Sequence, residues 1–98
     1  MKHITTKRQI NLKDGTEIPK GTVLEYVRHG IVVSCGVFRM GEREIVMRYR
    51  SLVKEPSVAT LEKWSENGIA KSVFGAKVEP DGYGQHGEPS WMLAAGLI

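Results

Sequence analysis

Turns interrupt the first half of this chain so often that only short strands fit between them. The turn signals lie at residues 14–15, 19–21, 29–30 and 40–42 and consist mainly of Asp, Gly and Pro residues. The segments between them are rich in β-branched residues and show no helical period. The pattern therefore predicts four or five antiparallel strands, which include residues 7–12, 22–27, 31–38 and 43–49, followed by a helical turn at residues 50–52.

A meander of short strands exposes its two edges unless the sheet curls on itself. We therefore predict a mainly β fold, with a small antiparallel barrel over residues 7–55. The arrangement of strands and turns over these residues resembles the Src-homology-3-like barrel, without the aromatic ligand-binding signature of the signalling domain. The resemblance implies an architecture and leaves the function open.

The hydrophobic period changes from that of a strand to that of a helix in the second half of the chain. Residues 57–67 place Trp64 and other apolar residues on one side, and Gly68 follows as a stop signal. Either Ser57 or Thr60 can cap the start of this helix. Since so short a helix is marginal alone, we expect it to lie across an open end of the barrel.

A turn-rich C-terminal arm is predicted over residues 68–98. Its first part is a possible hairpin or extended segment with Gly75 at the turn, and Ser90 can cap a short helical turn that ends near Gly96. We expect the arm to pack back onto the barrel as part of one domain, residues 1–98. The side chains expected to dock are Trp91, Leu93, Leu97 and Ile98.

Composition limits the class of protein. The 98 residues are 41% hydrophobic and 26% charged, which suits one globular domain and argues against disorder. The single cysteine, Cys35, lies in an apolar run and excludes an intrachain disulfide, so we expect a buried thiol in a reducing compartment. No apolar stretch suits a signal peptide or a membrane span, and we expect a cytoplasmic protein.

Basic residues concentrate in the first half of the chain. Residues 1–54 carry eleven Lys and Arg against five Asp and Glu, whereas residues 55–98 carry three against six. On a strand, alternate basic residues share one face and can contact neighbouring phosphates, with an aromatic ring to stack on a base. The alternative, which the nearby Glu42 and Glu44 favour, is a solvated face with the tyrosine in the core. The candidate binding residues are Arg39, Arg43, Arg48, Tyr49, Arg50 and Lys54.

Acidic residues and a histidine cluster near the C-terminus. Oxygen and imidazole ligands at Glu79, Asp81, His86 and Glu88 are chemically suited to a divalent metal or to base catalysis. Their spacing matches no established ligand pattern, and the intervening glycines and prolines are typical of turns. We therefore predict no metal, no cofactor and no catalytic set, and interpret the segment as turn-forming.

The last thirty-five residues or so carry a longer resemblance. They resemble the C-terminal segment of small uncharacterised proteins encoded by phages, prophages and bacteria, and the resemblance implies a phage or prophage source. The resemblance implies cysteines in many relatives at the positions where this chain has Ala76 and Gly84, so a thiol-based site there does not carry over. The matching residues that we expect to be structural are Trp64, Gly68, Glu79, Pro80, Asp81, Gly82, His86, Gly87, Pro89, Ser90 and Trp91. The other matching residues are Gly75, Val78, Gly96, Leu97 and Ile98.

The sequence favours a non-enzymatic binding module that engages a host or phage macromolecule, either protein or nucleic acid. One alternative is a small metal-dependent enzyme that uses Glu79, Asp81 and His86. Another is a structural virion or assembly component. The oligomeric state is left open by the sequence.

Overall fold

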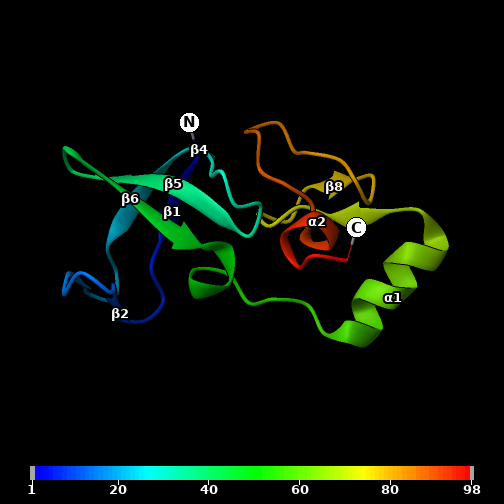
Figure 1. The fold of residues 1–98 in the computed structure, drawn as a ribbon, viewed down its shortest axis with the longest axis horizontal. Helices are drawn as coiled ribbons and strands as arrows, with labels where there is room; N and C mark the ends of the chain where they lie inside the picture. Colours follow the sequence, from blue (N-terminus) through cyan, green and yellow to red (C-terminus); the bar gives the residue numbers. More distant parts are fainter. Residues whose placement is uncertain (1, 98) are drawn as a thin grey trace.

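The computed structural model describes residues 2–97 and shows a mainly β protein, as the sequence predicts. Its main sheet has four antiparallel strands in the order β1-β4-β5-β6 (Figure 1). These strands are β1 (His3–Thr5), β4 (Val23–His29), β5 (Cys35–Met40) and β6 (Arg43–Arg48). The two-stranded sheets are β2 (Ile10–Asn11) with β3 (Glu17–Ile18), and β7 (Ala70–Lys71) with β8 (Lys77–Val78). The helical elements are η1 (Tyr49–Ser51), α1 (Val58–Asn67) and α2 (Trp91–Ala94).

The strands of the first half lie in two separate sheets, and within residues 2–97 no ladder closes them into one hydrogen-bonded barrel. The strands β2 and β3 are only two residues long, because the turn at Gly15 and then Pro19 interrupt them. They still contribute the buried side chains of Ile10 and Ile18 to the core. The main sheet therefore keeps an edge at β6 that no other strand pairs with in the described part of the chain.

The predicted strand at residues 31–38 is wrong in its first half. Residues 31–34 form a loop, in which the Cys35 N–H donates to the Val32 carbonyl at 3.0 Å, and β5 begins only at Cys35. Ile31 is fully exposed, so its β-branched side chain indicates neither strand pairing nor burial at this position. The short strand β1 was not predicted, because three residues before Thr6 carry too little pattern.

Aromatic side chains join the main sheet to the C-terminal arm. The Tyr26 ring lies 5.4 Å from the Phe38 ring and 4.9 Å from the Phe74 ring, measured between centroids. The Tyr26 and Tyr49 hydroxyls share a buried hydrogen bond of 2.8 Å. Since Phe74 follows β7, this cluster makes the arm and the sheet parts of one core.

The helix α1 has the ends that the sequence predicts, but it lies elsewhere. Ser57 caps it by accepting a hydrogen bond from the Thr60 N–H, and Gly68 ends it in the left-handed conformation with a φ of 69°. The helix lies beside β7, on the side of the arm away from the main sheet, and α2 lies between α1 and the main sheet (Figure 1). It buries Leu61 there and does not cover an end of the main sheet.

The arm folds into the predicted hairpin and helical turn. Gly75 takes a φ of 88° in the β7–β8 turn, and Ser90 caps α2 by accepting from the Leu93 N–H at 3.1 Å. The side chain of Trp91 is buried, as predicted, whereas Leu97 is 54% exposed and does not dock. The expected docking of Ile98 concerns a residue outside the described part of the chain. None of the helices formed by residues 2–97 is long and apolar enough to cross a membrane.

Alkaline pH is expected to unfold the protein through the buried tyrosine pair. Burial raises the pKa of Tyr26 and of Tyr49 above the ordinary value of 10.0. The folded state therefore holds these protons more tightly, so the stability they confer is complete below pH ~10 and is lost as the pH rises further. We expect the free energy of unfolding, measured by denaturant titration, to fall as the pH rises between the unfolded pKa near 10 and the raised folded pKa, by at most about 1.4 kcal/mol per pH unit for each tyrosine.

Tyr49→Phe separates this effect from the titration of lysines. Above pH ~10, the free energy of unfolding of this variant should decline less steeply with pH, by the slope that corresponds to one proton. The reason is that one tyrosine fewer ionises on unfolding. An absorbance titration in which the Tyr49 phenol ionises near pH 10 in the folded protein would contradict the expected raised pKa.

Candidate anion-binding site

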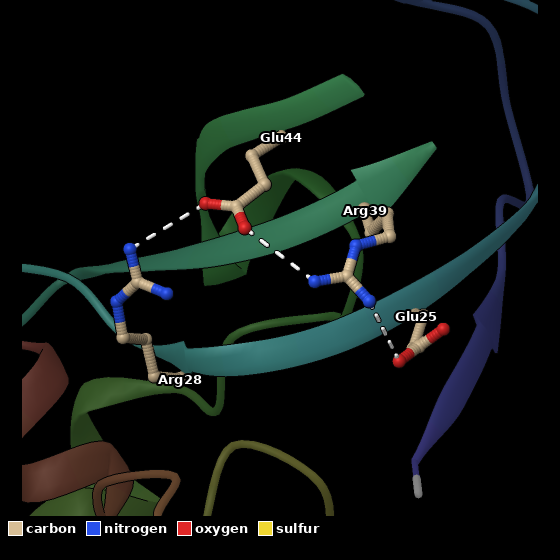
Figure 2. A network of polar contacts seen from close by, with 4 residues as sticks. All are labelled: Glu25, Arg28, Arg39 and Glu44. Atoms are coloured by element: carbon tan, nitrogen blue, oxygen red, sulfur yellow. Dashed lines mark hydrogen bonds and ion pairs between the residues drawn. The ribbon is translucent and has the colours of Figure 1, made fainter. Parts of the chain in front are cut away.

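The predicted basic residues divide into a paired group and an unpaired group. Arg39 on β5 contacts Glu25 on β4 at 3.4 Å and Glu44 on β6 at 3.5 Å, and Glu44 also contacts Arg28 at 3.5 Å. Figure 2 shows these four side chains as one row across three neighbouring strands. The Arg39 guanidinium is therefore committed to carboxylates of its own sheet, as the alternative of a solvated face predicts.

Arg43 is also committed to partners within the chain. Its guanidinium donates to the Asp14 carboxylate at 2.5 Å and to the Thr16 hydroxyl at 2.8 Å, which ties the start of β6 to the β2–β3 turn. The pKa of Asp14 lies below its ordinary value, first because the Thr16 main chain and hydroxyl bond to it, and then because of Arg43.

Tyr49 cannot serve as a binding residue. Its side chain is completely buried, and its ring is so closely packed that a Cβ added at Gly36 would lie 2.8 Å from it. The predicted alternation along the strand explains this burial, since Met47 and Tyr49 face the core while Arg48 and Arg50 face solvent. The prediction that a base stacks on the Tyr49 ring is therefore wrong.

The unpaired group forms a basic patch around η1. Two open hollows meet there: one of 330 Å³ is lined in part by Arg48 and Arg50, and one of 550 Å³ by Arg50 and Lys54. Within residues 2–97, no ion pair reaches these cations, and the only acidic residue in either lining is Glu55. The basic patch consists of Lys7, Arg8, Arg48, Arg50 and Lys54.

Two members of the basic patch were missed in the sequence. Lys7 and Arg8 follow β1, and the fold brings them to the segment after η1, where they share a hollow with Arg50 and Lys54. Their adjacency was visible as a basic pair, but more than forty positions separate them from Arg50. Only the packing of the two segments shows that they belong to the same surface.

The acidic residues of the C-terminal arm do not form a site together. Glu79 and Asp81 are exposed and flank the turn at Pro80, while His86 is half-buried. Among residues 2–97, no group of three or more His, Cys, Asp or Glu side chains is placed to hold a metal ion. Glu79, Asp81 and His86, which the alternative of a metal-dependent enzyme would use, are therefore not gathered into such a group in the described part of the chain.

Glu88 is instead a buried structural carboxylate. Its Oε2 accepts from the Ser72 hydroxyl at 2.8 Å and its Oε1 accepts from the His86 N–H at 3.1 Å, while the side chain is only 1% exposed. Gly84 lies directly against it, because a Cβ at residue 84 would be 2.2 Å from Oε2. A cysteine at this position, as the resemblance implies for relatives, does not fit the arrangement seen here.

No protein-family model, no curated protein and no solved structure matches this chain. The fold and the basic patch are therefore the observations on which a function can be argued.

Proposed function

We propose that the protein is a non-enzymatic binding module whose basic patch contacts the phosphate backbone of a nucleic acid. The observation that carries this proposal is the gathering of five cations around η1, all outside the ion pairs that engage Arg39 and Arg43. Unpaired guanidinium and ammonium groups gain most from phosphates, because they release counterions from the polyanion and have no internal carboxylate to give up.

The composition of the patch favours backbone contacts over reading of bases. Among residues 2–97, the only aromatic residue that lines its two hollows is Trp91, whose side chain is buried, so these hollows offer no exposed ring to stack on a base. Binding of this kind depends on charge and is weakly selective for sequence. The sequence predicts a macromolecular partner, either protein or nucleic acid, and the observed charges favour nucleic acid.

The phage or prophage source, and a role with a host or phage nucleic acid, remain a proposal that rests on the C-terminal string of residues. The described residues of that string include Gly68 and Ser90, which cap helices, and Gly75, which lies in a turn. These local roles do not require contact with the basic patch. The binding of nucleic acid can therefore be tested without knowledge of the source.

Substitution of two patch residues is expected to weaken binding. In fluorescence anisotropy with a labelled oligonucleotide, Arg50→Ala combined with Lys54→Ala should lower affinity about tenfold or more. The slope of the logarithm of affinity against the logarithm of salt concentration should also become shallower by about 0.9 for each phosphate that the variant no longer neutralises.

The matched control removes the same charge elsewhere. Lys71→Ala with Lys77→Ala changes two exposed lysines of the β7–β8 hairpin, and this variant should keep most of the affinity and the original salt slope. Equal affinities for the two variants would reject the basic patch as the site, and no binding by the unmodified protein would reject the function.

A further inference from the structure

The free edge of β6 has a regular pattern of outward-facing main-chain groups. The β5–β6 hairpin turns through Gly41, whose φ is 63°, and Met40 pairs with Arg43 on either side of the two-residue turn. In such a hairpin the flanking pair is hydrogen-bonded, and hydrogen-bonded pairs alternate from there along the ladder. The Tyr49 N–H, which donates to the Ser34 carbonyl at 3.1 Å, continues the same alternation beyond the strand.

Three residues of β6 therefore direct their main-chain groups away from β5. In this register, Arg43, Ile45 and Met47 bond to β5, whereas Glu44, Val46 and Arg48 face the open edge. Among residues 2–97, no backbone hydrogen bond outside the ladder reaches these three residues. The space beside the edge is an open hollow of 660 Å³ between β6 and residues 10–14.

The side chains of the same three residues are complementary to themselves. An antiparallel copy of β6 centred on Val46 places Glu44 opposite Arg48 of the other strand, and Val46 opposite its own equivalent. Val46 is 62% exposed, and its branched side chain suits a cross-strand contact. The contacts of Glu44 with Arg28 and Arg39 are both 3.5 Å long and exposed, so they do not prevent it from meeting a further cation (Figure 2).

We propose that two copies of this protein pair through the β6 edge, antiparallel and centred on Val46. Each of the three residue pairs exchanges two main-chain hydrogen bonds, and the two four-stranded sheets become one continuous sheet. The Glu44 to Arg48 contacts set the register, because a slip of two residues places Val46 opposite a charge.

The pairing and the basic patch share only Arg48. The strand ends at Arg48 and the chain turns into η1, so the pairing does not extend to Arg50. The anion-binding test changes Arg50 and Lys54, and the pairing is tested by other residues. The two proposals can therefore fail independently.

Charge reversal provides a test with its own rescue. In light scattering coupled to size-exclusion chromatography, run over a dilution series, the unmodified protein should show twice the mass of one chain and dissociate as it is diluted. Glu44→Arg alone, or Arg48→Glu alone, places like charges opposite each other at both ends of the pairing and should give monomers. An equal mixture of these two variants restores opposite charges at both ends and should give a heterodimer. The chain that carries both changes, Glu44→Arg and Arg48→Glu, should give a homodimer for the same reason.

The controls separate pairing from folding and from net charge. Glu62→Arg and Lys63→Glu make the same changes of charge on exposed positions of α1 and should leave the dimer unchanged. Circular dichroism melting of each variant establishes that it is folded. A monomeric unmodified protein at every concentration, or a dimer that survives the single reversals, would overturn the proposal, and so would a folded mixture that fails to associate.

Discussion

Removal of residues 89–98 is expected to unfold the protein. The deleted segment contains Trp91, Met92 and Ala94, whose side chains are buried in the same core cluster as the main sheet. The loss of Trp91 alone should cost about 3 to 5 kcal/mol, and a small domain has a total stability of only ~5 to 15 kcal/mol. Circular dichroism and thermal melting of the truncated chain should show no cooperative transition.

Single substitutions in the same arm locate the cause. Trp91→Ala should lower the free energy of unfolding by about 3 to 5 kcal/mol. Tyr83→Ala removes an aromatic ring that is 51% exposed, and it should cost much less. A truncated chain that keeps its melting temperature would show that the arm is a free peptide and not part of the core.

Loss of the Glu88 carboxylate is expected to have the second largest effect on stability. Glu88→Ala leaves the buried Ser72 hydroxyl and the His86 N–H without their acceptor and opens a void beside Gly84. The sum of an unmade buried hydrogen bond and a cavity predicts a loss of about 3 kcal/mol or more, measured by denaturant titration.

Glu88→Gln keeps the shape of the side chain and tests the hydrogen bonds separately. The Ser72 oxygen already accepts from the Phe74 and Ala76 N–H groups, so a glutamine amide facing it would leave the Ser72 proton without an acceptor. We expect an intermediate loss for this variant. Glu79→Ala, at an exposed position of the same arm, should change stability by no more than about 0.5 kcal/mol. A loss for Glu88→Ala as small as that of Glu79→Ala would contradict a structural role for the carboxylate.

Local features of the chain were predicted well, because a few neighbouring residues determine them. Ser57, one of the two caps that the sequence allowed, begins α1 and Gly68 ends it. Ser90 begins α2 and Gly75 makes the hairpin turn, both at the positions expected from capping and turn chemistry. The alternation that buries Tyr49 and exposes its neighbours was also present in the sequence. Where local chemistry was ambiguous, as in the apolar loop that contains Ile31, the prediction of a strand was wrong.

The sequence by itself determined the mainly β class, the ends of the helices and the excess of basic residues in the first half of the chain. Only the tertiary structure decided which of those cations are neutralised: Arg39 and Arg43 meet carboxylates from other segments, while Lys7 and Arg8 join Arg50. It also decided that Glu88 is buried as a structural acceptor. Capping and alternation act within a turn or two of the chain, whereas burial and ion pairing depend on contacts between distant segments, which no local pattern specifies.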